Sequence, residues 1–457
     1  MVKSRRHAVV LGGSIAGLLA ARVLSEHFDK VTLVERDALP SGPDPRKGVP
    51  QDRQLHGFLA GGVAALEQLF PGFITRMQQR GAEYIDVARV GFFTIGGVPL
   101  PSYDSGVRGL LASRPLLEAQ VRELVLARDN VTLRERCVAK GLFARGRTVQ
   151  GVHISPRDLP QVDETLTGDL IVDATGRGSR FVSWLSALSF APPREQIVRA
   201  NLTSATCTIR RRKDHLGGQS GFVISATPPS LRSGAALAIE GDRYIVSMTT
   251  YLGAPAPKTY EEMIAFARTL PARGLYDLLR DAEPLCEPAI FRDRESRRRY
   301  CEELHDFPDG LLVLGDALCN FNPLYGQGVT VAAREAQELD AWLHQGAPPR
   351  AFFRAAARLL DAPWSTIVSG DLQWPGVEGK RTASSRVLNG YMERLMRAAG
   401  RDHDTATVLL RVIHLLAPPS TLFAPKLVAS ALLRGRPFVL ADVAPMVHEG
   451  TAELPAE

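Results

Sequence analysis

The sequence has few cysteines and no long apolar run, and both absences narrow its class. Only five of its 457 residues are cysteines, and none forms a C-x-x-C pair or has a histidine at metal-ligand spacing. This scatter predicts neither a disulfide framework nor a metal site, and it favours a reducing cytoplasm as the location. No stretch reaches the ~18 uninterrupted apolar residues of a membrane-spanning helix, so none is expected. The cysteines are Cys137, Cys207, Cys286, Cys301 and Cys319.

A strong excess of one charge is also absent. Lysine and arginine number 55 against 49 aspartates and glutamates, and the net charge of +6 is mild for a chain of this length. A nucleic-acid partner is therefore not expected. With 45% apolar and 23% charged residues, the composition is that of a globular protein, which excludes disordered and fibrous classes.

Two segments have some membrane character. The apolar run at 8–11 stops at Gly12, which is too short for the apolar region of an export signal. The region 407–440 is apolar but is interrupted by charged residues and prolines, among them Arg411 and Pro418. We expect buried helices in this region, with a hairpin that contacts a membrane as the alternative.

Residues 7–35 have the pattern of a β-α-β unit. An apolar strand at 8–11, a glycine turn, a helix over 15–28 and a β-branched strand at 30–34 follow one another. This order predicts a parallel sheet. Further strands are expected at 168–173 and 310–314, and helices at 57–70, 115–127 and 327–344.

The pattern changes between residues 195 and 253. Alternating segments are separated there by turn signals such as Gly241-Asp242, which predicts an antiparallel sheet. A helical insert at 258–281 follows, the chain then returns to the first domain, and the region from 346 onward is mostly helical. The fold class is therefore α/β, with an added antiparallel-sheet domain and a helical C-terminal region.

The glycine turn at 12–17, GGSIAG, joins a strand to a helix. Small residues there let the backbone approach a pyrophosphate, whose charge the helix N-terminus stabilises. Ser14 replaces the middle glycine and keeps a short side chain. Glu35 ends the second strand, where a carboxylate accepts from ribose hydroxyls and disfavours a 2′-phosphate. The turn therefore indicates a dinucleotide site.

The same turn also approximates the nucleophile elbow of hydrolases. The pattern is Gly12-x-Ser14-x-Ala16. The hydrolase fold needs strands before the elbow, and only eleven residues precede Gly12. Glu35 would also have no role in such a site, so the dinucleotide interpretation is favoured.

A second turn of this kind occurs at 311–330, LLVLGDALCNFNPLYGQGVT. A strand ends in Gly315-Asp316, where the carboxylate would hold a second polyol, and a P-x-x-G-x-G turn from Pro323 then opens a helix. NAD has no use for a second turn. A flavin does, because the pyrimidine end of its reduced ring is anionic and is favoured by a helix N-terminus.

With these motifs, the chain resembles the single-component FAD-dependent monooxygenases with the aromatic-hydroxylase fold, particularly the branch of monensin- and lasalocid-type polyether epoxidases. Three segments carry the resemblance: the glycine turn with Glu35-Arg36, the strand exit DATGRGSR at 173–180, and the segment 315–330. One departure is Thr175-Gly176, where aromatic hydroxylases have an Asp-Gly that serves both cofactors. This departure bears on NAD(P)H binding.

The resemblance implies a Rossmann-like FAD-binding domain, a substrate-binding β-sheet domain and the helical C-terminal region. The FAD-binding domain would comprise 1–80, 104–190 and 290–345. The substrate domain would comprise 81–103 and 191–289, and the C-terminal region 346–457.

The resemblance also implies a set of cofactor contacts. Glu35 would bind the adenosine ribose, Arg36 would lie by the adenine, and Asp316 would hold the ribityl chain. The backbone amides of Val329 and Thr330 would meet the flavin O2. The complete set of implied FAD contacts is Gly12, Gly13, Ser14, Ala16, Gly17, Glu35, Arg36, Arg46, Arg114, Asp316, Pro323, Gly326, Gly328, Val329 and Thr330.

The implied activity is a monooxygenation through a flavin C4a-hydroperoxide, with NAD(P)H as a transient reductant. The expected reaction is epoxidation of an alkene in a large hydrophobic, polyketide-like intermediate, either free or bound to a carrier protein. One alternative is a redox-silent, FAD-bound cyclase that forms decalins in a spirotetronate-like pathway. Another is a flavin reductase of the geranylgeranyl type, which would add two mass units and not sixteen.

No catalytic side chain stands out. His56 follows a loop rich in proline and could face the flavin ring, but an ordinary loop histidine is the favoured interpretation. Tyr325 would suit a pocket wall or a core equally. Apolar and hydroxyl residues at 222–224 and 245–251 would suit a hydrophobic substrate or a sheet core, and the basic clusters at 210–213 and 297–299 are interpreted as solvated edges.

Overall fold

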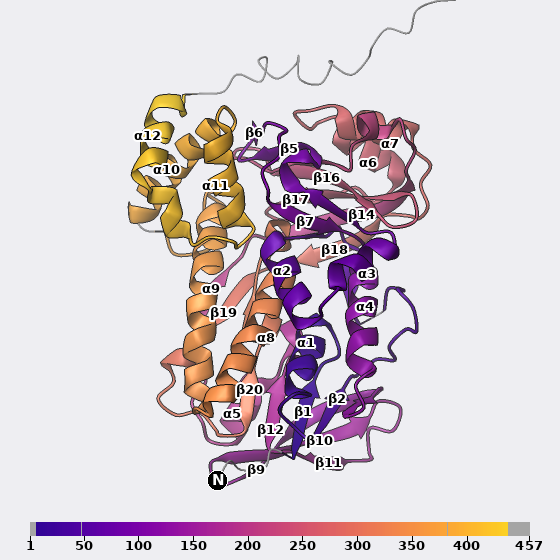
Figure 1. Ribbon diagram of the computed structural model, residues 1–457, viewed down its shortest axis with the longest axis vertical. Helices are drawn as coiled ribbons and strands as arrows, with labels where there is room; N and C mark the ends of the chain where they lie inside the picture. Colours follow the sequence, from indigo (N-terminus) through magenta and orange to yellow (C-terminus); the bar gives the residue numbers. More distant parts are fainter. Residues whose placement is uncertain (1–5, 47, 382, 437–457) are drawn as a thin grey trace, which may run out of the picture.

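The computed structural model describes residues 6–46, 48–381 and 383–436. A five-stranded parallel sheet has the order β20-β12-β1-β2-β8 (Figure 1). Every strand in it is short, and the inner strands are mostly apolar and buried, as expected where helices cover a parallel sheet, whereas the edge strand β8 has polar residues. The bounds are β1 His7–Leu11, β2 Lys30–Val34, β8 Val131–Arg134, β12 Leu170–Asp173 and β20 Leu311–Val313. The predicted parallel sheet is therefore confirmed.

Helices pack against this sheet, and two of them lie side by side in Figure 1. These two are α1 (Ile15–Leu24) and α8 (Gly328–Gln345). The helix α4 (Arg114–Leu126) also packs on α1, and Ser113 caps it by accepting from the Leu116 amide at 3.2 Å. Three more helices belong to this part of the fold: α2 Ala60–Leu69, α3 Phe73–Gln79 and α5 Phe181–Ala187. A small antiparallel sheet is formed by β9 Cys137–Arg145, β10 Thr148–Pro156 and β11 Glu164–Thr167.

A seven-stranded sheet forms the second layer, with the order β18-β14-β17-β16-β15-β5-β6. Its central hairpin turns at Gly241 and Asp242, both at positive φ, as the sequence predicts. The strand β18 extends this sheet to Asp293, beyond the expected boundary at 289. The bounds are β5 Gly91–Ile95, β6 Val98–Pro99, β14 Leu202–Arg210, β15 Gly221–Ile224, β16 Arg232–Ile239, β17 Arg243–Thr250 and β18 Ala289–Asp293.

One face of this sheet is closed by the helical insert, α6 (Tyr260–Ala267) and α7 (Gly274–Asp281). Phe222, Val246 and Met248 are buried in the core between them. These residues, considered above for substrate binding, are therefore core residues. Two smaller sheets complete the fold: β3 Gly57–Phe58, β4 Glu83–Asp86 and β7 Arg108–Leu111, and β13 Glu195–Val198, β19 Ser296–Arg299 and β21 Cys319–Asn320.

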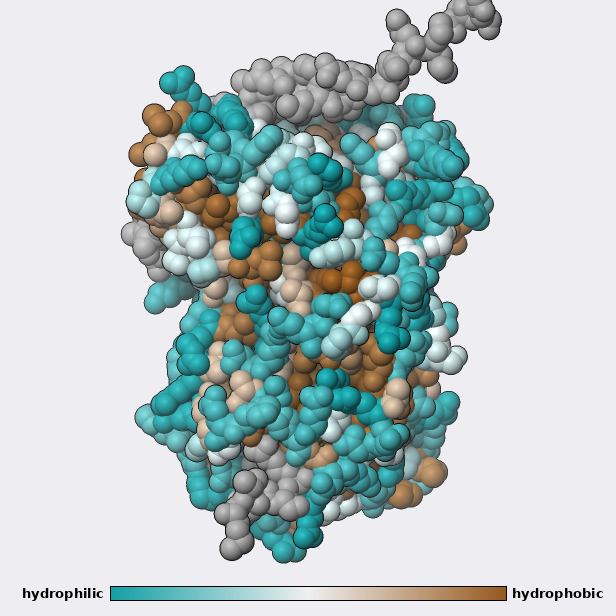
Figure 2. Space-filling model, in the orientation of Figure 1, coloured by the Kyte–Doolittle hydropathy of each residue, from teal (hydrophilic) through white to brown (hydrophobic). Residues whose placement is uncertain are grey.

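The C-terminal region is helical. Apolar side chains gather on the surface of its last helices (Figure 2), where Phe423, Leu432 and Leu433 are exposed, whereas Leu409 and Leu410 are buried. Within the described ranges, no helix is both long and apolar enough to cross a membrane; residues 437–440 of the apolar region lie outside those ranges. The bounds are α9 Pro349–Asp371, α10 Ala383–Ala399, α11 His403–Ile413 and α12 Pro425–Arg434.

The prediction that the arginines at 297–299 form a solvated edge is wrong. Arg298 is 3% exposed and Arg299 6%. Arg298 pairs with Glu302 at 3.1 Å, and Arg299 pairs with Glu195 at 2.8 Å. Burial of a guanidinium is tolerated where carboxylates neutralise it.

Candidate functional site

The three segments that carry the resemblance meet at one edge of the parallel sheet. The parallel register aligns Leu11 with Asp173 and Asp173 with Val313, so the turns that follow β1, β12 and β20 lie together. A Cβ added at Gly12 would lie 2.5 Å from the Ala174 oxygen, and one added at Gly315 would lie 2.7 Å from Ala16 Cβ. The glycine turn and the turn after β20 therefore lie side by side at this edge.

The glycine turn has no room for side chains. Gly12 has φ +101°, which L-residues rarely adopt, and a Cβ at Gly17 would overlap the Gly12 carbonyl oxygen. A Cβ at Gly13 would lie 3.1 Å from the Glu35 side chain. Glycine at these positions therefore allows the turn to pack closely against the exit of β12 and against Glu35.

We expect Gly17→Ala to lower the free energy of unfolding by about 2–3 kcal/mol, because the turn must move to admit one methyl group. Urea denaturation would measure the change. The control is Gly141→Ala, where an added Cβ meets nothing within 4 Å. Equal stability of the two variants would contradict the packing described for this turn.

Ser14 precedes α1 but does not cap it, because its Oγ donates to Glu118 at 2.9 Å. The amides of the first helical turn therefore have no capping side chain. Arg114 donates to Ser14 Oγ at 3.0 Å, and Arg46 pairs with Glu118 at 3.0 Å. Both arginines beside this uncapped helix start are thus already paired with buried carboxylates, since Arg114 also pairs with Asp52 at 3.1 Å.

Glu35 and Arg36 have different environments. Glu35 is buried, accepts the Gly13 amide at 2.7 Å and pairs with Arg46 at 3.1 Å, so its carboxylate is held against the glycine turn. The Arg36 side chain is 61% exposed and donates to the Gly48 oxygen at 3.1 Å. The structure brings Glu35 into the site and leaves Arg36 at its rim.

Asp316 lies in a 3-10 turn directly after β20, with a side chain that is 35% exposed. Arg177 bridges Asp316, at 3.4 Å, and the buried Asp293, and it also donates to the Phe321 oxygen at 3.0 Å. The Thr175 hydroxyl donates to Asp173 at 2.6 Å, so it stabilises the loop to which it belongs.

Glu335 lies beneath this second turn, on α8, and is fully buried. Its Oε2 accepts the Gly315 amide at 2.7 Å, whereas Oε1 has no partner among the described residues. Loss of hydration, with a smaller contribution from Asp316, raises the pKa of Glu335 to about 8.

The start of α8 is also uncapped by a side chain. Gln327 precedes the helix without capping it, and Val329 and Thr330 are in its first turn, with Gly328 exposed at the helix start. Pro323 is exposed in the preceding 3-10 turn, and Gly326 ends that turn at φ +66°. All five predicted contacts of this segment therefore lie around one helix start.

A buried acid, Asp371 at the end of α9, holds the loop before α8. Asn322 donates to Asp371 Oδ1 at 2.8 Å, and the hydroxyls of Tyr325 and Tyr251 lie 3.3 and 3.5 Å from the same oxygen. Burial raises the pKa of Asp371 to about 7. Tyr325 is thus a loop anchor.

His56 is half-buried in a loop, and its Nδ1 lies 2.9 Å from the Gln54 oxygen. Loss of hydration, with the positive charge of Arg114 as a smaller cause, lowers the pKa of His56 to about 4. The imidazole is therefore neutral at pH 7.

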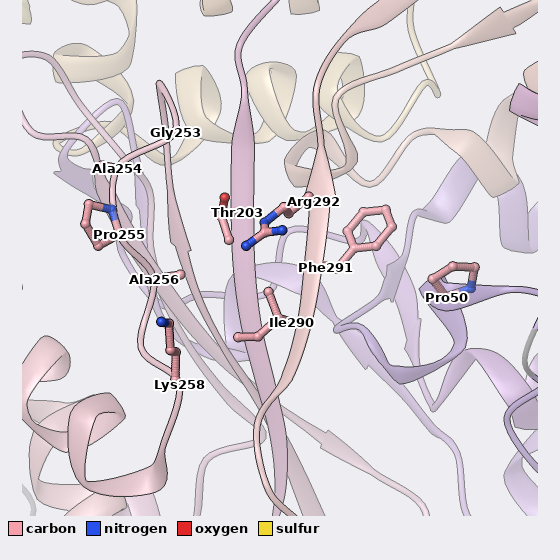
Figure 3. Close-up of a pocket in the computed structure, with 10 residues that line it drawn as sticks. All are labelled: Pro50, Thr203, Gly253, Ala254, Pro255, Ala256, Lys258, Ile290, Phe291 and Arg292. Carbon is pink, nitrogen blue, oxygen red and sulfur yellow. The ribbon is translucent and has the colours of Figure 1, made fainter.

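A cavity of about 610 Å³ opens at the edge of the seven-stranded sheet (Figure 3). Thr203 and Arg292 are register partners on β14 and β18, and Ile290 lies two residues along the same strand face. Lys258 and the loop 253–256 complete that side. The lining combines apolar surface with two cations, which suits an amphipathic anion.

Several charged residues of the site were not predicted from the sequence: Asp52, Glu118, Arg177, Asp293, Glu335 and Asp371. Three of the six, Asp52, Glu118 and Asp293, are acids that pair with arginines. The sequence carries no clear signal for these residues, since Glu335, for example, follows Arg334 in a stretch that also contains Gln337 and Glu338.

Comparison with known proteins identifies one close relative. Protein Rv3254 of Mycobacterium tuberculosis is 33% identical to this chain over 387 residues, which are 80% of each protein. The chain belongs to the family of this mycobacterial protein. No protein-family model matches the sequence.

Solved structures share the fold. A flavoprotein/dehydrogenase from Cytophaga hutchinsonii has a TM-score of 0.67 at 14% identity, and covers 97% of this chain and 99% of its own. The flavin-dependent brominase Bmp2 has a TM-score of 0.64 at 14% identity, and the match covers 93% of this chain and 98% of the brominase. OxyS anhydrotetracycline hydroxylase from Streptomyces rimosus has a TM-score of 0.60 at 18% identity, and the match covers 90% of this chain and 76% of the hydroxylase. The predicted fold class is therefore confirmed, and the polyether-epoxidase branch remains a hypothesis.

Proposed function

We propose that this protein is an FAD-dependent monooxygenase. One observation carries the proposal: the uncapped start of α1, the carboxylates of Glu35 and Asp316, and the turn that leads to the uncapped start of α8 lie at one sheet edge. FAD has a pyrophosphate between two polyols and a ring that is anionic when reduced. The pyrophosphate and the reduced ring would each lie at a helix start, and the two polyols would each meet a carboxylate.

The residues present fit such a cofactor. Gly12 and Gly17 let the turn pack closely on the protein's own backbone, and the uncapped amides at the start of α1 would donate to phosphate oxygens. Arg46 and Arg114 would balance the pyrophosphate charge, and Glu35 would accept ribose hydroxyls. The Asp316 side chain is partly exposed, and its carboxylate would accept ribityl hydroxyls while it also contacts Arg177.

The protein's part in the reaction is to bind and orient. The amides of Val329 and Thr330 would stabilise negative charge on the reduced ring, and Asp371 would keep the preceding loop in place through Asn322. The bound flavin, once reduced, supplies oxygen activation and the transfer of one oxygen atom.

We further propose that the substrate is an alkene in a large hydrophobic, polyketide-like molecule, and that the product is an epoxide. An alkene needs no general base, whereas a phenol benefits from one. Burial lowers the pKa of His56 to about 4, which makes it a weak base and supports the alkene. NAD(P)H would bind transiently as the reductant.

The test uses cis-parinaric acid, a conjugated polyene with a carboxylate, as the probe, because the sheet-edge cavity combines apolar and cationic side chains. Purified protein with FAD is reduced anaerobically with NADPH or NADH, mixed with the probe and exposed to air. We expect a product 16 mass units heavier. A gain of two units would identify a reductase, and an isomer formed without oxygen or reductant would identify a redox-silent cyclase; either would overturn the proposal.

A further inference from the structure

Three metal-ligating side chains lie at the opposite end of the two helices that begin at the site. His27 follows α1, and Asp340 and His344 are one turn apart on α8. One ligand atom from each lies within 4.8 Å of the other two. Within residues 6–46, 48–381 and 383–436, no other group of three such residues is as compact.

The cluster is already partly assembled. His27 Nε2 lies 2.7 Å from Asp340 Oδ1, and His344 Nδ1 lies 3.6 Å from the same oxygen. The two imidazole rings are 4.6 Å apart between centroids. In the part of the chain that the structure describes, no lysine or arginine pairs with Asp340, so this carboxylate lacks a permanent cation.

The backbone also favours a cation here. The helices α1 and α8 run in the same direction (Figure 1). Glu335 of α8 bonds to Gly315, which lies beside Ala16 at the start of α1, and Asp340, further along α8, contacts His27 beyond the end of α1. Both C-terminal ends therefore point their partial negative charge towards the cluster.

We propose that His27, Asp340 and His344 bind a zinc ion that joins the C-terminal ends of α1 and α8. Two imidazoles and a carboxylate are common zinc ligands, and water would complete the coordination. The His27, Asp340 and His344 side chains are 11%, 41% and 69% exposed, so the ion can enter from solvent. His344 releases its hydrogen bond to the Asp340 carbonyl when it binds.

The role of this ion is structural. Asp340 is twelve residues from the start of α8, which is about 18 Å along the helix axis and too far for contact with a ligand at the other end. The ion would fix the relative position of the two helices. The inference does not depend on the proposed monooxygenase function. It also revises the expectation of no metal site, which considered only histidines near cysteines.

The test uses the full chain without a polyhistidine tag, stripped with EDTA and titrated with zinc chloride in a calorimeter. We expect one zinc per chain and a higher unfolding temperature with zinc. His344→Ala and Asp340→Asn should each weaken zinc binding at least about tenfold. His344 is exposed, so its removal leaves the fold intact, which circular dichroism would check.

The matched control is His305→Ala, which removes another exposed histidine and should leave zinc binding unchanged. Cobalt substitution gives a second readout, since imidazole and carboxylate ligands produce visible absorption that His344→Ala should abolish. Two results would overturn the proposal: no binding to the native chain at about 100 μM zinc, or equal affinity in the native chain and both variants.

Discussion

Replacing Asp316 with alanine should give a protein that purifies without FAD and has no flavin absorbance. The carboxylate follows β20 at the sheet edge and is the acceptor that we assign to the ribityl hydroxyls. Each charge-assisted hydrogen bond contributes about 1.5–3 kcal/mol, so the loss of two should weaken FAD binding by at least about a hundredfold. Absorbance near 450 nm and FAD titration would measure the effect.

The control for this variant is Asp309→Ala. Asp309 is exposed at the opposite end of the same strand, before Gly310. Its side chain forms no hydrogen bond or ion pair among the described residues. The Asp309→Ala variant should therefore retain FAD. If Asp316→Ala bound FAD as tightly as Asp309→Ala, the assignment of the second polyol contact would be wrong.

Glu335→Gln should make the protein without cofactor more stable at alkaline pH. The pKa of Glu335 is about 8 in the folded chain against 4.5 for a free glutamate. Between pH 4.5 and 8 the folded state therefore keeps a proton that the unfolded state has lost, so stability falls as pH rises through this window. The loss approaches ~1.4 kcal/mol per pH unit, with about 5 kcal/mol as its ceiling.

Glutamine keeps an oxygen for the Gly315 amide and carries no charge, so at pH 8.5 we expect a gain of about 2–4 kcal/mol over the native chain and at pH 5 almost none. Urea denaturation at several pH values would measure both. Glu338→Gln, on the same helix, is the control. Some slope should remain in Glu335→Gln, because Asp371 has a pKa raised in the same direction. An unchanged slope would mean that Glu335 is ionised in the folded chain.

The sequence predicted those parts of the fold that depend on local pattern. The β-α-β unit at 7–35, the cap at Ser113 and the hairpin at Gly241 each follow from spacing, glycine or a capping hydroxyl within a few residues. The close approach of Ala16 to Gly315 was also predictable, since strands of a parallel sheet end at one edge. These features need no knowledge of distant contacts.

The charged network could not be predicted in the same way. Arg177 is held by Asp293 and Asp316, which are more than a hundred residues away in the chain. The burial of Arg298 depends on Glu302 and on Asp361 of α9. Pairing of this kind is a property of the folded chain, and sequence spacing carries no signal for it.

The attachment of Asp371 to Asn322 and Tyr325 has a consequence for biosynthesis. The loop before α8 lies in the part of the fold that contains the parallel sheet. The carboxylate that accepts its hydrogen bonds, however, is in the last turn of α9. A ribosome that has released only the first 345 residues has therefore not yet delivered the carboxyl that secures this loop. The part of the fold that contains the parallel sheet can collapse early, but it acquires its final form only after the C-terminal helices have emerged.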